Sequence, residues 1–298
     1  MDDFRLKVFL AAARTSSFTR AAAQFGISQP AVSKQIGRLE AQYGVRLFVR
    51  RGNRLELTDA GRTMLACAER LDDDYRRLRQ RMSLCTATVA GELRLGASTT
   101  VAQYLLPALL ARFTSRYPGV QVSLLSGNSD RIETALEERA IDLGVVEKAG
   151  RRQGLHYAAC MPDELVLIAR PEGRYASVES LSPGELRTVP LVLREEGSGT
   201  LEVIARTLAG AGIRLPMLRT VLRLDSTEAI KGFVRHSDAM AVVSVISVVD
   251  ELRSGTLRIV DIDGISFRRD FSFVHAGTGL TPLSERFVAF VQDELRRG

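Results

Sequence analysis

The sequence is poor in the residues that form disulfides and bind metals. Among its 298 residues are only three cysteines and three histidines. Cys67, Cys85 and Cys160 are odd in number, widely spaced and without a CxxC pair, so they form neither a disulfide framework nor a zinc motif. The histidines stand alone, without the spacing of metal ligands. We therefore expect reduced, apolar cysteines, no metal and no cofactor.

Long hydrophobic runs are also missing. The sequence contains no stretch of about 18 apolar residues, as a membrane-spanning helix would require. Met1 is followed directly by Asp2 and Asp3, rather than by a basic and then an apolar segment, which does not fit a secretory signal. We therefore expect a cytoplasmic protein with no membrane partner.

Positive charge is concentrated in the first third of the chain. Residues 1–90 hold 16 Lys and Arg against 9 Asp and Glu, a net charge of +7, whereas residues 91–298 hold 25 against 26, a net charge of −1. A basic segment joined to a near-neutral body is typical of a nucleic-acid-binding protein. Charge alone does not distinguish this interpretation from a basic face that is only exposed to solvent and binds no partner. The length of the chain suits two or three domains.

The first part of the chain predicts three helices in a compact unit. Apolar residues recur at helical spacing over residues 3–14 and indicate the first helix. Ser16 or Ser17 is suited to cap a second helix, and Gly26 to end it in the left-handed conformation. A third helix begins after Ser28, because serine is a good cap and the proline two residues later falls in the first turn.

The third predicted helix has one apolar and one polar face. Val32, Ile36 and Leu39 repeat at intervals of four and three residues and must face the core. In a helix-turn-helix the second helix enters the major groove of DNA, with its N-terminal side chains nearest to the bases. We therefore expect the polar face to contact base edges and phosphates. It carries Gln29, Ser33, Lys34, Gly37 and Arg38.

A basic hairpin is predicted to follow this helix. The segment VRLFVRRGNRLELT alternates into two short strands with a turn at Gly52 and Asn53. Arg50, Arg51 and Arg54 lie on the hairpin, as a wing that grips the phosphate backbone would need. A winged helix used only for protein contacts stays open as an alternative.

Residues 59–90 predict a long helix followed by a hinge. Two apolar series, each repeating every seven residues, form a seam of period 3.5, which is typical of a coiled coil. Such a helix would be roughly 40 Å long and poorly stable alone. We therefore expect a second copy of the chain to cover the seam, unless the helix packs on its own body. The predicted dimerisation residues are Leu71, Tyr75, Leu78 and Met82.

Residues 91–298 alternate between strand and helix patterns, which predicts an α/β domain with a parallel sheet. Hydroxyl side chains lie at three strand-to-helix junctions, residues 98–100, 197–200 and 225–227. Backbone N–H groups and the positive end of a helix dipole at such junctions suit a small anion. Plain helix capping is the alternative, because the same residue types cap helices in any protein.

The sequence shows no arrangement typical of a catalytic site. The glycines of EEGSGTLE lack the lysine of a phosphate-binding P-loop. We therefore expect that the protein is not an enzyme. A ligand-responsive DNA-binding regulator predicts a strong preference for specific sites, whereas a nonspecific architectural DNA binder predicts a weak one.

The run SFTRAAAQFGISQPAVSKQIGRLEAQYGVRLFVR, followed by LTDAG, resembles the winged helix-turn-helix signature of LysR-type transcriptional regulators. The resemblance covers the whole chain, strongly up to Gly61 and more loosely beyond it. It implies DNA contacts by the wing arginines and by Gln29, Pro30, Ser33 and Lys34. Gly37 departs from the family, which often has a longer polar residue there, so we expect one contact fewer.

The same resemblance implies the organisation of the chain. A winged helix-turn-helix would span residues 1–58, the linker helix and hinge 59–90, and a two-lobed effector domain similar to periplasmic solute-binding proteins 91–298. Lobe one would comprise residues 91–162 and 268–298, and lobe two residues 163–267.

The resemblance also implies partners and an effector site. The family pairs its linker helices, which implies a dimer or tetramer on a double-stranded DNA operator, with the transcription machinery as a further partner. A small effector would bind between the lobes. We expect it to be an anion, because the hydroxyl groups and helix N-termini at the three junctions suit one. By resemblance, the effector-binding residues are Ser98, Thr99, Ser126, Gly199, Thr200 and Thr227.

Overall fold

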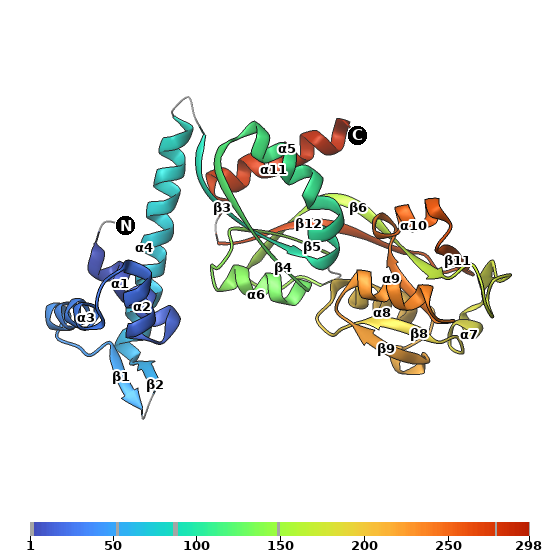
Figure 1. Cartoon of the computed structure of the whole chain (residues 1–298), viewed down its shortest axis with the longest axis horizontal. Helices are drawn as coiled ribbons and strands as arrows, with labels where there is room; N and C mark the ends of the chain where they lie inside the picture. The colour runs from blue at the N-terminus through green and yellow to red at the C-terminus, as the bar shows by residue number, and fades with distance from the viewer. Residues whose placement is uncertain (1–2, 52–53, 86–88, 148–149, 278, 298) are drawn as a thin grey trace. The chain divides into compact units, whose positions relative to one another are not determined.

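The structure is a computed structural model, and it describes residues 3–51, 54–85, 89–147, 150–277 and 279–297. The chain divides into two compact units, Met1–Thr86 and Ala87–Gly298, which we call the head and the body (Figure 1). The predicted hairpin turn at Gly52 and Asn53 lies outside the described residues, as do residues 86–88 of the predicted hinge.

The head folds as the sequence predicts, because its helix ends are encoded locally. Ser17 and Ser28 cap α2 and α3, each accepting a hydrogen bond from the backbone N–H three residues on. Gly26 ends α2 in the left-handed region with φ of 63°, and Ser16 ends α1 with φ of 47°. The elements of the head are α1 (Phe4–Thr15), α2 (Phe18–Phe25), α3 (Gln29–Tyr43), β1 (Phe48–Arg51), β2 (Arg54–Leu57) and α4 (Asp59–Leu84).

The core of the head lies between its helices. Val32, Ile36 and Leu39 of α3 are buried against α1 and α2, as predicted. The small side chains of Ala21 and Ala22 on α2 are buried in the same cluster. β1 and β2 pair as an antiparallel hairpin with Phe48 opposite Leu57. This core fixes the polar face of α3 on the surface of the head.

Lobe one of the body is a layered α/β structure. Its strands are covered on one face by α5 and α11, which lie side by side in Figure 1, and on the other face by α6. Its elements are β3 (Ala90–Ser98), η1 (Val101–Leu105), α5 (Leu106–Arg116), β4 (Gly119–Gly127), α6 (Ser129–Glu137), β5 (Leu143–Glu147) and α11 (Pro282–Arg297).

Lobe two has the same kind of layering. Apolar side chains of α8 form one buried cluster with the strands, and those of α9 and α10 form another. Its elements are β7 (Ser180–Leu181), α7 (Pro183–Leu186), β8 (Leu191–Arg194), α8 (Gly199–Gly210), η2 (Leu215–Met217), β9 (Thr220–Leu224), α9 (Thr227–Arg235), β10 (Met240–Ser244), η3 (Val245–Ser247), α10 (Val249–Ser254) and β11 (Arg258–Ile262).

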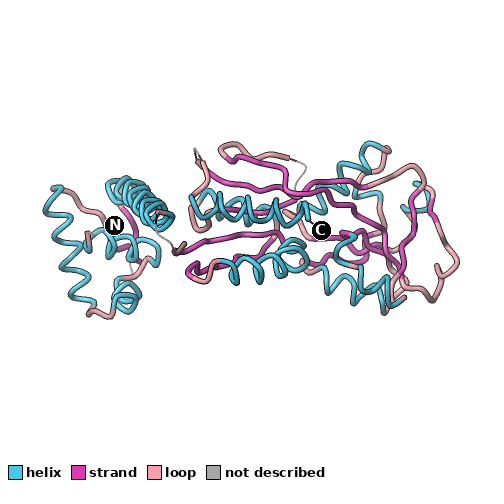
Figure 2. Tube along the Cα trace, turned by 90° about the horizontal axis from the view of Figure 1, so that it is seen from above, coloured by secondary structure: helices cyan, strands magenta, loops and turns pink. Residues whose placement is uncertain are grey.

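Two long strands, β6 (Leu155–Ala169) and β12 (Phe267–Ala276), join the lobes. Figure 2 shows the long strands running along the body with helices beside them. The sheet order is β4-β3-β5-β12-β6-β10-β8-β9, with β11 against β6 and β7. The predicted lobe boundaries, between residues 162 and 163 and between 267 and 268, fall within β6 and at the start of β12.

The sheet is mixed, so the predicted parallel sheet is wrong in part. β3 is parallel to β4 and β5, and β8 is parallel to β9 and β10. β12 is antiparallel to both β5 and β6, and β6 is antiparallel to β10 and β11. The reason is that the chain passes directly from lobe to lobe along β6 and returns along β12. No helix in the described ranges is both long enough and apolar enough to cross a bilayer.

Candidate DNA-binding and effector-binding sites

The polar face of α3 presents the residues predicted to read DNA. Pro30, Lys34 and Arg38 are exposed. The Gln29 side-chain amide donates a hydrogen bond of 3.0 Å to the Ser33 hydroxyl, which holds both groups together at the start of the helix. A Cβ built at Gly37 meets open space, so this residue leaves a gap in the face.

A hollow of about 430 Å³ brings the wing next to the start of α3. Gln29, Arg50 and Arg54 line it together with Ser17 and Thr19 from the start of α2. Arg51 is exposed on the neighbouring strand position and lies 3.6 Å from the Glu56 carboxylate. Sequence reasoning missed the α2 residues, although the cap signal at Ser17 marks a helix N-terminus, where a phosphate binds favourably.

Glu40 of α3 holds the wing in place, a role that its sequence position did not predict. Its carboxylate accepts hydrogen bonds from the backbone N–H of Leu47 at 2.8 Å and from the Arg46 guanidinium at 2.9 Å. Glu40 therefore ties α3 to the segment that leads into β1, and the two predicted DNA-contacting surfaces keep a fixed relation.

The linker helix α4 exposes most of its predicted seam. The side chains of Leu71, Leu78 and Met82 are 53%, 51% and 58% exposed. Tyr75 differs, because it packs against the core of the head and the Arg79 guanidinium lies 5.9 Å from its ring centre. Three of the four predicted dimerisation residues are thus available to a partner, and Tyr75 contacts its own head.

Thr99 and Arg194 meet where the two lobes face each other. The Arg194 guanidinium is only 3% exposed and donates from Nη2 to the Thr99 hydroxyl at 3.5 Å. Thr99 in turn donates to the Gly127 carbonyl at 3.3 Å. Arg194 is also held by the neighbouring Glu195 carboxylate at 2.8 Å. Sequence reasoning missed Arg194, because an arginine that ends a buried strand has no motif around it.

Thr200 faces a buried ionic network rather than open space. Arg269 of β12 donates to the Thr200 hydroxyl at 2.8 Å, and that hydroxyl donates to Glu147 at 3.3 Å. Arg269 also lies 2.6 Å from Asp163 and 3.5 Å from Glu147. Asp163 accepts a further hydrogen bond of 2.6 Å from Ser244. The network joins α8 to the strands that connect the lobes.

The remaining predicted effector residues have different environments. Ser98 is buried and accepts from the Val101 N–H at 3.4 Å, which is a capping role. Ser126 is exposed on β4, paired with Ala97. A Cβ at Gly199 would lie 1.5 Å from the Glu147 carbonyl oxygen, so only glycine permits this close approach of the lobes.

Thr227 begins α9 and is buried, next to a contact between the lobes. The adjacent Glu228 accepts a hydrogen bond from the Tyr104 hydroxyl of η1 and pairs with Lys231 at 2.8 Å. Burial raises the pKa of Glu228, but hydrogen bonds from Lys231 and Tyr104 outweigh it and leave that pKa below its usual value. The pKa of Tyr104 is raised, mainly because the side chain is buried and secondly because its hydroxyl donates a hydrogen bond to Glu228.

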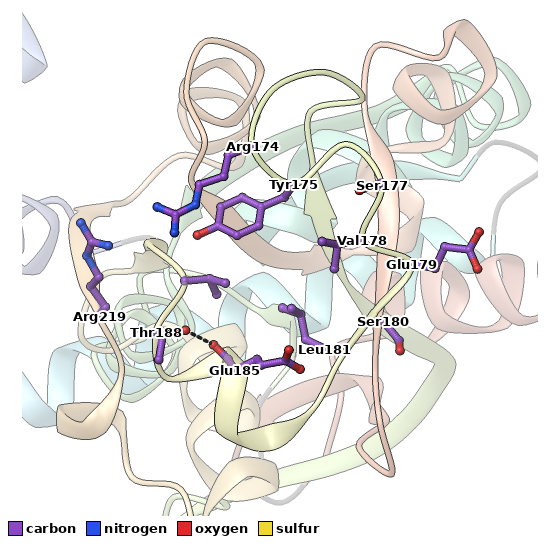
Figure 3. Close-up of a pocket in the computed structure, with 11 residues that line it drawn as sticks. Arg174, Tyr175, Ser177, Val178, Glu179, Ser180, Leu181, Glu185, Thr188 and Arg219 are labelled. Atoms are coloured by element: carbon purple, nitrogen blue, oxygen red, sulfur yellow. Dashed lines mark hydrogen bonds between the residues drawn. The ribbon is translucent and has the colours of Figure 1, made fainter.

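A separate cavity of about 710 Å³ lies within lobe two. Figure 3 shows Arg174 and Tyr175 close together on its wall, with Glu185 and Arg219 elsewhere around it. The six residues predicted to bind the effector are not among those that line this cavity. Size alone therefore does not identify the effector site.

The cysteines are free thiols that differ in exposure. Cys85 is exposed, and Cys67 and Cys160 are partly buried. Burial raises the pKa of Cys160 to about 12, which keeps this thiol protonated at neutral pH.

A winged helix-turn-helix with a polar recognition face, joined to a two-lobed α/β domain, defines a class of DNA-binding regulators that carry a ligand-binding domain. The family model for the bacterial regulatory helix-turn-helix protein, lysR family, matches residues 4–62, and the model for the LysR substrate binding domain matches residues 86–296. The chain belongs to the LysR family of transcriptional regulators, with a DNA-binding helix-turn-helix and an effector-binding domain.

Similar proteins agree with this assignment, and two of the three described next match nearly the whole chain. A RuBisCO operon transcriptional regulator of Allochromatium vinosum is 32% identical over 98% of this chain and 96% of its own. Full-length CbnR, solved in complex with its target DNA, is 25% identical with a TM-score of 0.66, covering 98% and 99% of the two chains. The CcmR regulatory domain of Synechocystis PCC6803, solved with 2-PG, is 28% identical with a TM-score of 0.61, covering 68% and 96%.

Proposed function

We propose that this regulator acts in the cytoplasm as a dimer or tetramer, binds one operator through paired recognition helices, and responds to a small anion held between its lobes. We assign it no catalytic role and regard the transcription machinery as its further partner. The division into winged helix-turn-helix (residues 1–58), linker and hinge (59–90) and effector domain (91–298) is part of the proposal, and the separate buried cores of the head and of the two lobes support it.

The observation that carries the anion site is the buried guanidinium of Arg194. It faces a hydroxyl of the opposite lobe, that of Thr99, at 3.5 Å. Its charge has one close carboxylate, that of Glu195, which is itself partly exposed. The nearby Ser198 hydroxyl is buried and has no hydrogen-bond partner within the described residues. An anion between the lobes would give the Ser198 hydroxyl a partner and would offer the Arg194 guanidinium a further acceptor beside Glu195 and Thr99.

Lys231 is a less suitable cation for the effector. Its ammonium group donates to the Ser247 carbonyl at 2.7 Å and to the carboxylates of Glu228 and Glu251, each at 2.8 Å. These contacts use the three N–H groups that a lysine has. Arg194, rather than Lys231, is therefore the cation that we assign to the effector.

The grouping of polar residues on the head supports the DNA contacts. We propose that Gln29, Pro30, Ser33, Lys34 and Arg38 face the major groove and that Arg50, Arg51 and Arg54 contact phosphates. The hollow that Gln29 shares with Arg50 and Arg54 has a size and charge suited to the DNA backbone.

Thermal unfolding of the full chain tests the anion site. We expect 2-PG, or another compound from a panel of small carboxylates and phosphate esters, to raise the Tm of the wild-type protein, because a ligand stabilises by RT ln(1 + [L]/Kd). Replacing Arg194 by Gln removes the buried charge and should lower the affinity about tenfold or more.

Arg187→Gln is the control, because this arginine is exposed and lies outside the site. It should retain the full ligand-induced shift. The proposal is wrong if Arg194→Gln keeps that shift while remaining folded, or if uncharged analogues stabilise the wild type as well as the anions do.

A further inference from the structure

The backbone at Leu47 joins three parts of the head: the recognition helix α3, the wing and the start of the linker helix α4. Its side chain is completely buried in the core of the head. Its N–H donates to the Glu40 carboxylate of α3 at 2.8 Å, and its carbonyl accepts a hydrogen bond of 3.0 Å from the N–H of Thr58, the cap of α4. The next residue, Phe48, begins β1. Leu47 is thus held by α3 on one side and by the start of α4 on the other.

The hydroxyl of Thr58 adds a second bond between the same two segments. It donates to the Arg46 carbonyl at 2.6 Å, and it accepts a hydrogen bond of 2.9 Å from the Gly61 N–H in the first turn of α4. A helix cap needs only the second of these bonds. Thr58 therefore starts the linker helix and also binds it to the segment that leads into the wing.

Gly61 allows α4 to lie directly against the Leu47 backbone. A Cβ built at this buried glycine would lie 2.1 Å from the Leu47 carbonyl oxygen and 2.9 Å from Cδ2 of Leu57. The shorter of these contacts is to backbone, which cannot rotate aside as the end of a flexible side chain can. Any larger residue at position 61 must therefore move the start of α4 away from Leu47, although alanine is the better helix former.

The direction in which α4 leaves the head determines where its exposed seam lies. Leu71, Leu78 and Met82 mark this seam, and its middle is about 24 Å from Gly61 along the helix. A tilt of about 10° at the start of α4 would move the middle of the seam by about 4 Å relative to α3, which is about one base-pair step of DNA. In a dimer paired through the seam, such a shift changes the distance between the two copies of α3.

We propose that Thr58 and Gly61 are positioning residues that set the spacing between the two DNA half-sites that the protein recognises. They hold α4 against the backbone of Arg46 and Leu47, which Glu40 ties to α3. The inference rests on the proposed dimer that pairs through α4 and reads DNA through α3, and it adds the contact that fixes the distance between the two reading helices. Neither residue is among those assigned to base contacts, so the bases preferred within each half-site should not depend on them.

Selection of duplexes by the full-length protein tests this role. The half-site is first obtained with the wild type from random duplexes, and a second library then carries two copies of it at every spacing over about one helical turn. We expect the wild type to prefer one spacing. Gly61→Ala should shift that spacing by about one base pair or reduce the preference for it about tenfold, with the same half-site bases. Thr58→Val, which removes the hydroxyl and keeps the shape, should reduce the preference about threefold or more.

Thr63→Val is the matched control, because the exposed Thr63 hydroxyl donates to the Asp59 carbonyl within α4 at 3.0 Å. It should keep the wild-type spacing. The inference is wrong if Gly61→Ala and Thr58→Val keep the wild-type spacing preference, if Thr63→Val alters it as much as Thr58→Val does, or if the spacing changes only together with the half-site bases. If Gly61→Ala does not fold, Thr58→Val decides. A wild type without any preferred spacing would overturn the proposed dimer and this inference with it.

Discussion

At the scale of single residues, the buried charges of the body are arranged in networks that span segments distant in sequence. Arg269 on β12 contacts Asp163 on β6, Glu147 on β5 and Thr200 on α8. Removing one member of such a network would leave an uncompensated buried charge, which is strongly destabilising. The network therefore fixes the position of α8 relative to β6 and β12. It also fixes residues 197–200, where α8 begins.

The contact of Tyr104 and Lys231 with Glu228 predicts a pH dependence. The pKa of Glu228 is lowered below its usual 4.5, so its contribution to stability is complete above about pH 4.5 and is lost as the pH falls through the folded-state value. Because the side chain of Glu228 is 53% exposed, we expect a contribution of at most about 1 kcal/mol.

Urea unfolding of wild type and Glu228→Gln across pH 3 to 7 measures this contribution, with about 1 kcal/mol as its upper bound. The wild type should have the higher midpoint at neutral pH, and the two midpoints should converge in acid. A difference that stays constant, or that grows as the pH falls, would show that the ionised carboxylate does not stabilise the fold.

Residues whose role depends on their immediate neighbours were predictable from sequence, and residues whose role depends on distant segments were not. Ser17, Ser28 and Gly26 act within one helical turn, so their cap and turn signals were sufficient. Arg194 meets Thr99 across 95 positions of the chain, and Arg269 meets Asp163 across 106. Periodicity and motifs carry no information about such pairs.

At the scale of elements, α4 is the part of the head whose apolar surface is least covered. Leu71 and Leu78 lie seven residues apart along it, Met82 follows four residues later in the second series, and all three are more than half exposed. The α4 segment nearer its start is covered, because Met64, Leu65 and Ala68 pack against the core of the head. The exposed seam therefore lies mainly beyond the part of α4 that packs on this core, as a linker that pairs with a second copy would require.

Replacing Leu71 and Leu78 by Glu tests this pairing. Each buried leucine contributes about 1.5–3 kcal/mol, and a buried unpaired carboxylate adds a penalty. We expect the wild type to have at least twice the mass of one chain in light scattering, and the variant the mass of one chain.

Arg70→Glu and Arg77→Glu provide the control, since these residues of α4 lie away from the heptad positions and should leave the mass unchanged. A variant with glutamates at 71 and 78 that keeps the wild-type mass would contradict the role of the seam.

The strand directions in the sheet could not be predicted from the sequence. The strands and helices of the body were recognisable from their alternation, but the direction of a strand depends on its neighbours. β6 and β12 pair with each other along their length, with Leu155 opposite Ala276 at one end and Leu165 opposite Phe267 at the other. About a hundred residues of chain separate the paired positions. An alternating pattern reads the same in either direction, so the antiparallel crossing could not be predicted.

At the scale of the whole molecule, we propose that the protein reads bases through the start of α3 and contacts phosphates through its wing. The Gln29–Ser33 pair lies where base edges would be contacted, and Arg51 lies on the wing strand. Base contacts discriminate between sequences, whereas phosphate contacts strengthen binding to any duplex. The two kinds of residue should therefore affect binding in different ways.

The most direct measurement is the affinity of the wild type, Gln29→Ala and Arg51→Ala for an operator selected from random duplexes and for a scrambled duplex, over a range of salt concentrations. Gln29→Ala should reduce the ratio of specific to nonspecific affinity about tenfold, while Arg51→Ala should weaken both duplexes alike and reduce the salt slope by about one. Equal losses on both duplexes from Gln29→Ala, with an unchanged ratio, would contradict the placement of α3 in the major groove.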